Sequence, residues 1–207
     1  MKKIILTLAL AAIATSAFAQ ISVGGGYLSS TKTSGDNAFT GQGFYAGVDY
    51  NIHLGTSGLG VAPGVFYSSI TDESRASLIG GIAKIEGKTV EQFINVPVNF
   101  NYGFNFVDGA LKLSLYAGPT LNYCISSKTT LSGSVAGVGG STDPINNFEA
   151  DKDYKPLNVL VGGGVALDIV EIIRVNFGYN YGLMDLHANE NIELKRAGWH
   201  VGLALVF

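Results

Sequence analysis

The sequence closes with Arg196-Ala-Gly-Trp-His-Val-Gly-Leu-Ala-Leu-Val-Phe207, in which large apolar residues occupy every second position. Successive side chains of a β-strand point to opposite faces, so this alternation predicts a strand with one apolar face. The apolar face carries Trp199, Val201, Leu203, Leu205 and Phe207, and the other face carries His200, Gly202, Ala204 and Val206. Because an apolar strand with an unpaired edge would aggregate, we expect it to pair with the first strand of the chain. That pairing would close the sheet into a barrel, the form in which β-structure crosses a membrane.

The N-terminal residues have the pattern of an export signal. The features are Lys2 and Lys3, an apolar run over residues 4–14 and a small-x-small cleavage site at Ala17-Phe-Ala19. We expect residues 1–19 to be a cleaved signal peptide and residues 20–207 to form one β-barrel domain. Loss of the two lysines would take the formal net charge from −3 to −5, and no basic patch suggests a nucleic-acid partner.

The remaining sequence is typical of an all-β protein. No apolar run after residue 19 approaches the roughly 20 residues that a transmembrane helix needs. The chain has 28 Gly, 10 Tyr and 11 Phe and only 14% charged residues, and its β-branched and aromatic content favours strands. Its one cysteine, Cys124, has no partner for an internal disulfide, and we interpret it as a small packed thiol.

Alternating apolar positions predict eight strands, separated by long polar stretches and short turns. The strands lie near residues 21–27, 44–52, 59–68, 90–102, 111–125, 157–169, 173–181 and 196–207. The long polar stretches are residues 29–42, 71–88, 126–155 and 185–195, and the short connections fall at 55–58, 104–109 and 170–171. Long and short connections alternate, as in outer-membrane barrels, whose short turns face the periplasm. The sequence therefore predicts an all-β fold, an eight-stranded antiparallel up-and-down transmembrane β-barrel.

The two faces of these strands distinguish a membrane barrel from a soluble barrel of the lipocalin type. The apolar face of each strand carries essentially no charge, whereas the charged and amide residues share the opposite face. A lipocalin would show its polar face to water and keep the apolar face inside. Aromatic residues also fall near strand ends on the apolar face, where the girdles of membrane barrels lie. They are Phe44, Tyr67, Phe100, Tyr102, Tyr123, Tyr181, Trp199 and Phe207.

Three prolines, Pro63, Pro97 and Pro119, fall within strands that should be paired on both sides. Because proline lacks the N–H donor of the ladder, we expect bulges or local breaks at these positions.

The interior of an eight-stranded barrel is just wide enough to be filled by side chains, so charges there should be paired. A turn near residues 170–171 places Asp168 opposite Arg174, and Lys112 on the neighbouring strand should lie at a similar height. We predict a ladder of Lys112, Asp168 and Arg174 near the periplasmic end, which Asp49 could join from across the lumen. The favoured interpretation is structural, a neutralised plug, and the alternative is a proton or ion relay.

Catalytic and metal-binding patterns are weak. None of the three histidines shows a recognised spacing to a nucleophile or an acid, and we expect a structural or hydrogen-bonding role for His200. We therefore expect no enzymatic activity, no metal site and no cofactor.

Three segments and the final residue have counterparts in a known family. They are Phe93-Ile-Asn-Val-Pro-Val-Asn-Phe100, Tyr116-Ala-Gly-Pro-Thr-Leu-Asn122, Asn176-Phe-Gly-Tyr-Asn-Tyr-Gly-Leu183 and Phe207. Together they resemble the outer-membrane β-barrel domain proteins of the PorT-like, porin-family type, over nearly the whole chain after residue 19. Where that family usually has a carboxylate two residues before the proline, this chain has Asn95. The resemblance implies an integral outer-membrane protein, and it implies that Phe207 is the signal read by the outer-membrane assembly machinery.

We expect a non-enzymatic role, structural or in surface interaction, carried by long extracellular loops. The expected partners are outer-membrane lipid and lipopolysaccharide, the assembly machinery and an unidentified surface ligand. The alternative is a narrow channel or transporter for small hydrophobic molecules, which the inward Phe66, Phe93 and Tyr116 would line.

Overall fold

The computed structural model describes residues 19–35, 37–55, 57–78, 83–107, 110–135, 138–151, 154–187 and 194–207. The expected signal peptide lies outside the described residues, except for Ala19, which begins the first strand. None of the helices in the described ranges is both long and apolar enough to span a membrane.

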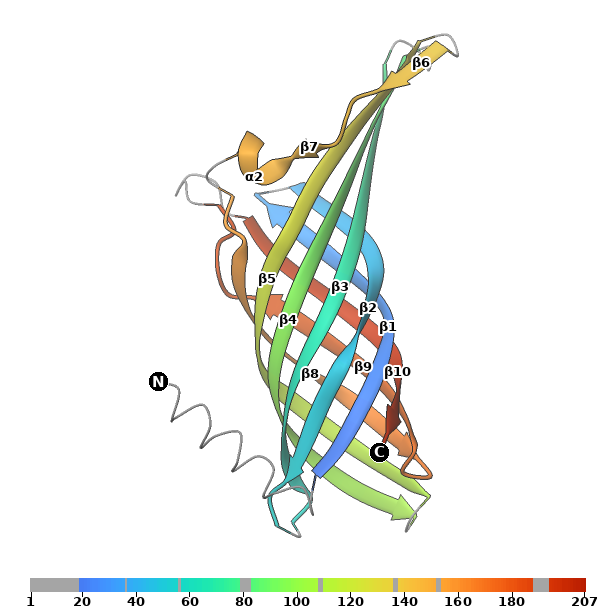
Figure 1. The fold of residues 1–207 in the computed structure, drawn as a ribbon, viewed down its shortest axis with the longest axis vertical. Coiled ribbons are helices and arrows are strands. Elements are labelled where there is room, and N and C mark those ends of the chain that lie inside the picture. Colours follow the sequence, from blue (N-terminus) through green and yellow to red (C-terminus); the bar gives the residue numbers. More distant parts are fainter. Residues whose placement is uncertain are drawn as a thin grey trace.

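Eight long antiparallel strands form a closed ring, which confirms the expected fold class (Figure 1). In ring order the strands are β1 (Ala19–Ser34), β2 (Asn37–His53), β3 (Leu59–Leu78), β4 (Ala83–Val107), β5 (Leu111–Val135), β8 (Leu157–Ile169), β9 (Ile173–Gly182) and β10 (Leu194–Val206). The closing strand β10 pairs with β1 from Ser22↔Val206 to Ser34↔Leu194, as its apolar face predicts. Two short strands, β6 (Val138–Ser141) and β7 (Ile145–Asn146), and the helix α2 (Asn147–Ala150) lie beyond the outer end of the ring.

The strands are staggered around the ring by ten residues, and this stagger fixes their tilt and the width of the barrel. Trp199 of β10 pairs directly with Ser29 of β1. Followed in the other direction, the register runs from Trp199 through Tyr179, Gly163, Ala117, Phe100, Val61 and Ile52 and reaches β1 at Ala19, ten residues before Ser29. Eight strands with this stagger tilt by about 45° and leave room inside only for side chains.

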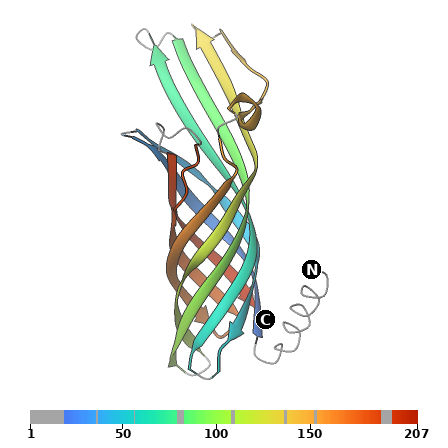
Figure 2. The same cartoon turned by 90° about the vertical axis from the view of Figure 1, so that its left-hand side faces the viewer.

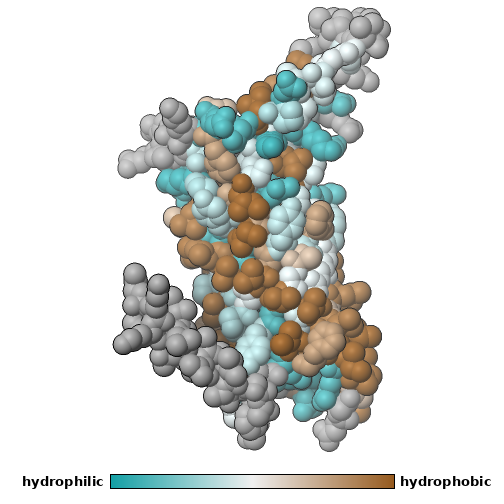
Figure 3. Space-filling view, in the orientation of Figure 1, coloured by the Kyte–Doolittle hydropathy of each residue, from teal (hydrophilic) through white to brown (hydrophobic). Residues whose placement is uncertain are grey.

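Apolar side chains cover the outside of the ring, and polar side chains fill the inside. Seven of the eight expected girdle aromatics are exposed, and Tyr67, the eighth, packs on the outward Phe44 with ring centroids 6.2 Å apart. Buried polar residues of the inner face include Ser22, Asn51, Ser68, Ser114, Asn122 and Asn158. Figure 3 shows apolar surface over the middle and lower barrel and more hydrophilic surface towards the protruding strands. A soluble lipocalin-like barrel would have the opposite distribution.

Three of the four predicted long loops, 29–42, 71–88 and 126–155, contain long stretches of strand, so these three loop predictions are wrong, whereas most of the fourth, 185–195, lies outside the described residues. β1 and β2 leave only residues 35 and 36 between them. The predicted loop 71–88 contains the outer ends of β3 and β4, and the predicted loop 126–155 contains the outer end of β5 with β6, β7 and α2. Figures 1 and 2 show β3, β4, β5 and β6 rising together well beyond the other strands.

The strands extend because the sheet continues outside the membrane, where both of its faces meet water. The apolar alternation then disappears, while Thr- and Ser-rich segments still pair. The hydroxyls of Thr89 and Thr129 lie 2.9 Å apart across β4 and β5, and those of Thr31 and Thr40 lie 2.9 Å apart across β1 and β2.

Pro63, Pro97 and Pro119 each interrupt one ladder, so of the expected bulges or local breaks the structure has local breaks. Pairing skips two residues beside each proline, between β2 and β3, β3 and β4, and β4 and β5 respectively, and resumes in the same register. Because donors alternate in direction along a strand, each proline lacks the N–H that would enter the interrupted ladder. The register shifts lie elsewhere, at Gln92/Phe93 and Asn105/Val107.

Candidate functional site in the barrel lumen

The inner cluster consists of Asp49, Asp168 and Arg174, near the turn that joins β8 to β9. Asp168 and Arg174 are direct register partners. Arg174 Nε donates to Asp168 Oδ1 at 2.6 Å and Nη2 donates to Oδ2 at 3.0 Å, a bidentate pair. Arg174 Nη1 donates to Ser22 Oγ at 3.2 Å and lies 3.9 Å from Asp49 Oδ1. The structure therefore brings three of the four expected ladder residues together.

Lys112, the fourth expected ladder residue, points elsewhere. It is the register partner of Asp168, as the sequence predicts, but its Nζ lies 3.4 Å from His53 Nε2 and its stem lies over Gly103. The expected contact with Asp168 is not formed between these two described residues. Both carboxylate oxygens of Asp168 already accept from Arg174, so the lysine turns towards the inner rim of the barrel.

A layer of aromatic and amide side chains crosses the middle of the lumen. Tyr45 Oη donates to Asn176 Oδ1 at 2.8 Å, and Tyr116 Oη lies 3.1 Å from His200 Nε2. The Tyr45 and His200 rings meet edge-on with centroids 5.6 Å apart. Gly202 makes room for this layer, because a Cβ there would collide with the Tyr45 hydroxyl. Four strands, β2, β5, β9 and β10, are thus tied across the barrel interior.

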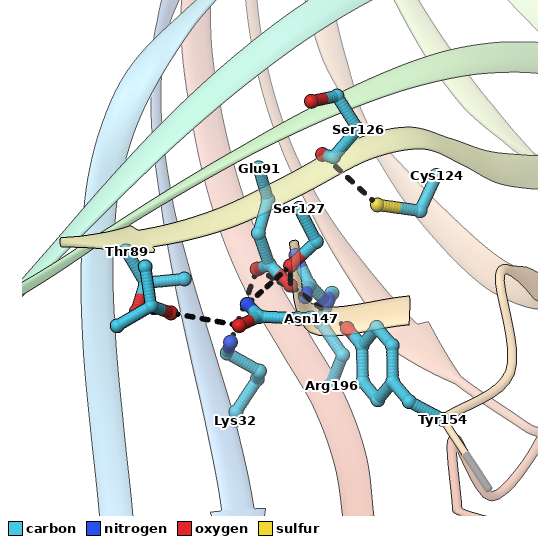
Figure 4. Close-up of polar contacts among 10 residues, drawn as sticks. Lys32, Thr89, Glu91, Cys124, Ser126, Ser127, Asn147, Tyr154 and Arg196 are labelled. Atoms are coloured by element: carbon cyan, nitrogen blue, oxygen red, sulfur yellow. Dashed lines mark hydrogen bonds and ion pairs between the residues drawn. The ribbon is translucent and has the colours of Figure 1, made fainter. Parts of the chain in front are cut away.

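A second cluster of charges lies at the outer mouth of the barrel, and we call Lys32, Glu91, Tyr154 and Arg196 the mouth cluster (Figure 4). Glu91 is only 2% exposed. Its Oε2 accepts from Arg196 Nη2 at 2.7 Å and lies 3.1 Å from Lys32 Nζ. Its Oε1 accepts from Tyr154 Oη at 2.8 Å. One buried carboxylate therefore joins β1, β4, β10 and the segment before β8.

A bulge in β5 turns a further side chain towards Glu91. Gln92 pairs with Ser126 and Phe93 pairs with Cys124, so Ile125 is the additional residue on β5. Cys124 and Ser127 consequently both point inward, and Ser127 Oγ lies 3.4 Å from Glu91 Oε1. Such re-aiming of a side chain is a common use of bulges.

The mouth cluster lies outside the membrane-spanning segments. Arg196 is three residues outward of the girdle residue Trp199, and on β2 and β4 the outward side chains at its height, Gln42 and Gln92, are polar. Burial would raise the pKa of Glu91, but the charges of Arg196 and Lys32 lower it to about 2. Glu91 is therefore ionised at any pH the protein meets near neutrality.

The segment between β7 and β8 covers the mouth and is anchored by this cluster. Asn147 of α2 donates from Nδ2 to Ser127 Oγ at 2.8 Å and accepts at Oδ1 from Thr129 Oγ1 at 3.0 Å. Phe148 packs against the buried apolar group of Ile70, Phe93 and Cys124. Tyr154 then ties the far end of the segment to Glu91. Figure 4 shows Asn147 and Tyr154 reaching Ser127 and Glu91.

Only two residues of the mouth cluster, Glu91 and Arg196, could have been identified from the sequence. Period-two alternation puts Glu91 and Arg196 on the inner faces of their strands, and a buried charge requires a partner. Lys32 and Tyr154 fall in stretches that the sequence predicts as loops, where alternation gives no facing.

Residues 14–188 match the family described as outer membrane protein beta-barrel domain. Ail, the attachment invasion locus protein of Yersinia pestis, is a similar solved structure, with 14% identity, 91% of this chain and 99% of that chain covered, and a TM-score of 0.48. Neisserial surface protein A has 14% identity, with 89% of this chain and 96% of that chain covered, and a TM-score of 0.46. The outer membrane enzyme PagL has 8% identity, with 89% of this chain and 97% of that chain covered, and a TM-score of 0.40. These scores carry no functional argument, and no protein with a curated description matches. The chain belongs to the outer membrane protein beta-barrel domain family and is located in the outer membrane.

Proposed function

We propose that this barrel is a non-enzymatic surface-recognition protein, and that its recognition element is the sheet that protrudes from the membrane. The length of the strands carries this proposal. β4 and β5 have 25 residues each, whereas β8 and β10 have 13. A tilted strand of about 9–11 residues is enough to cross the hydrocarbon core. Roughly half of β4 and β5 is therefore ordered sheet that membrane crossing does not require.

The protruding sheet presents a free strand edge. β2 pairs with β3 only as far as Gln42↔Thr71, whereas β3 pairs with β4 onward to Leu78↔Ala83. Beyond Thr71, in the part of the chain that the structure describes, β3 is thus paired with β4 but no longer with β2. Such an edge can accept an extended segment of another polypeptide as an added strand.

The direction of the edge donors follows from the register. Leu54 N donates to Leu59 O in the β2–β3 ladder, and Gly103 N donates to Gly58 O towards β4. Donors alternate along a strand, so odd-numbered residues of β3 point their N–H towards β2 and even-numbered residues point theirs towards β4. The N–H of Arg75 consequently points away from β4 and out of the free edge.

The polar side chains tied across the lumen support recognition over transport. The ties from Tyr45 to Asn176 and from Tyr116 to His200 cross the path that a small hydrophobic molecule would take. The bidentate pairing of Asp168 with Arg174 supports the structural interpretation of the interior charges, in preference to an ion relay.

We further propose that the chain is related to PorT-like proteins and that Phe207 is its assembly signal. The proposed partners are lipid, lipopolysaccharide and the assembly machinery. In support, Phe207 is 74% exposed on the outer face and its backbone is paired with Ile21.

The free edge can be tested by a matched pair of substitutions in the barrel reconstituted in lipid nanodiscs. Arg75→Pro removes the outward N–H, and Arg75→Gln removes the same charge but keeps that N–H. An array of extended peptides rich in β-branched residues serves as the probe. We expect wild type and Arg75→Gln to bind the same peptides and Arg75→Pro to bind at least tenfold more weakly. No binding by wild type, or equal binding by the proline variant, would overturn the proposal.

A further inference from the structure

The guanidinium of Arg196 has unused donors in a buried position. Arg196 is only 5% exposed, and only its Nη2 has a hydrogen-bond partner, Glu91. Its Nε and Nη1 are buried and have no hydrogen-bond partner among the described residues. Leaving such a donor unpaired costs free energy, so a site of this kind favours an acceptor.

Arg174 also lies inside the barrel, and each nitrogen of its guanidinium has a hydrogen-bond partner. Its Nε and Nη2 donate to Asp168, and its Nη1 donates to Ser22. The two arginines are buried in the same lumen, yet only Arg196 retains free donors. This contrast separates a binding group from a structural one.

The donors of Arg196 border a cavity of about 230 Å³ in the lumen. Its outer part includes the apolar side chains of Leu28, Ile70, Phe93 and Leu160 in the wall. The Arg196 guanidinium carbon lies 4.5 Å above the centre of the Phe93 ring, so the charged group and this apolar surface adjoin. Farther in, the cavity passes the side chains of Tyr45, Phe66 and His200 and continues to the inner cluster.

A second buried donor faces the same level of the barrel. Asn158 is fully buried, and its Nδ2 has no hydrogen-bond partner within the described part of the chain. The stagger of the strands places Asn158 of β8 at about the height of Arg196 of β10. Two independent unpaired donors therefore mark this end of the lumen.

The charges at the mouth select the ligand class. Lys32 and Arg196 carry two positive charges against the single negative charge of Glu91, which leaves an excess of one. A monoanion would neutralise that excess, whereas a dianion such as a phosphate monoester would overcompensate it. The cavity is smaller than the ~300–1,000 Å³ of pockets for drug-sized ligands, so the apolar part must be small.

We propose that the outer part of this cavity binds a small amphiphilic monocarboxylate, with its carboxylate on the free donors of Arg196 and its apolar body against Phe93, Ile70 and Leu28. A single aromatic ring or a short alkyl chain fits this description. This site is separate from the strand edge of β3, so either can be correct without the other.

Calorimetric titration of the nanodisc-embedded barrel tests the site, with benzoate and hexanoate as probes and benzyl alcohol and hexanol as neutral counterparts. We expect saturable binding of one carboxylate per barrel and at least tenfold weaker binding of the alcohols, because a charge-assisted hydrogen bond is lost. Arg196→Lys keeps the charge and a donor for Glu91 but removes the free guanidinium donors, and it should weaken benzoate binding at least tenfold.

Lys88→Gln is the matched control. It removes a whole charge from the protruding sheet, where the Lys88 side chain is 57% exposed, but none of the free donors, so we expect a change of no more than about threefold. A large loss in Lys88→Gln with none in Arg196→Lys would indicate general electrostatic attraction and overturn the proposal. So would the absence of saturable carboxylate binding, which would mean that water satisfies these donors.

A spectroscopic readout on the wild-type protein avoids any dependence on how variants fold. In arginine-labelled protein, the Nε–H resonance of Arg196 should move on addition of benzoate and stay in place with benzyl alcohol. Equal shifts with both compounds, or none with either, would contradict the site.

Discussion

Replacing Glu91 by glutamine should destabilise the outer mouth of the barrel more than any surface substitution. The change keeps the shape of the side chain and one carbonyl acceptor but removes the charge that Arg196 and Lys32 share. Arg196 is buried and would then face a second cation without a counter-charge. The bond from Tyr154 would also lose its charge assistance, so the segment over the mouth should loosen.

The magnitude follows from the electrostatics of the folded state. At about 1.4 kcal/mol per pKa unit, the lowering of the Glu91 pKa from 4.5 to about 2 corresponds to roughly 3 kcal/mol of folding free energy. Breaking a buried ion pair by removing one partner typically costs about 3–5 kcal/mol. Glu91 is almost fully buried, so solvent screening reduces this little. We expect a loss of about 3 kcal/mol.

The direction in which the folding stability changes with pH follows from the same pKa shift. Because the pKa of Glu91 is lower in the folded state than in the unfolded state, its stabilisation is present above about pH 4.5 and is lost as the pH falls towards 2. The glutamine variant should lack this contribution. Urea unfolding of the barrel in lipid vesicles at neutral and acidic pH measures both effects.

Glu73→Gln supplies the control, because the Glu73 side chain is 50% exposed on the protruding sheet. It should unfold within about 0.5 kcal/mol of wild type. Equal unfolding free energies for Glu91→Gln and wild type at neutral pH, or the same acid-dependent loss in both, would refute the reasoning.

Two further comparisons use the same unfolding assay. Arg174→Gln should cost about 3–5 kcal/mol because it leaves its bidentate carboxylate partner unpaired, whereas Lys112→Gln should cost less than about 1 kcal/mol; equal costs would contradict the different contacts of the two cations. Gly202→Ala should cost about 1–3 kcal/mol because its Cβ would collide with the Tyr45 hydroxyl, whereas Gly140→Ala meets nothing within 4 Å and should be neutral; a neutral Gly202→Ala would mean that the aromatic layer shifts freely.

The membrane-spanning part of the fold could be predicted from the sequence because lipid imposes a regular pattern. Lipid requires an apolar outer face and a narrow lumen requires a polar inner face. The alternating positions of residues such as Trp199 and His200 therefore predict which side chains point outward and which point inward. The same constraint predicted the pairing of Asp168 with Arg174 across a tight turn. Val170 and Glu171 in that turn both have positive φ, 52° and 58°, as a type I′ hairpin turn requires.

The outer part of the structure could not be predicted because the constraint ends where water begins. Both faces of the protruding strands are wet, so nothing in residues 71–88 distinguishes a paired strand from a loop. The partner of Lys112 could not be predicted either, because it depends on whether Lys112 or Arg174 occupies the oxygens of Asp168 in the folded barrel. The contact between Tyr154 and Glu91 depends on the path of a whole segment, which no local pattern encodes.

Amide hydrogen exchange in lipid-embedded protein tests the protruding sheet and its free edge most directly. In β3 beyond Thr71, we predict slow exchange at even-numbered residues such as Asp72 and Ser74, whose N–H groups donate to β4. The odd-numbered Arg75 and Ser77, whose N–H groups point away from β4, should exchange quickly. Uniformly fast exchange would show a loop in place of the sheet, and uniformly slow exchange would show that the edge is already covered; either result would contradict the account.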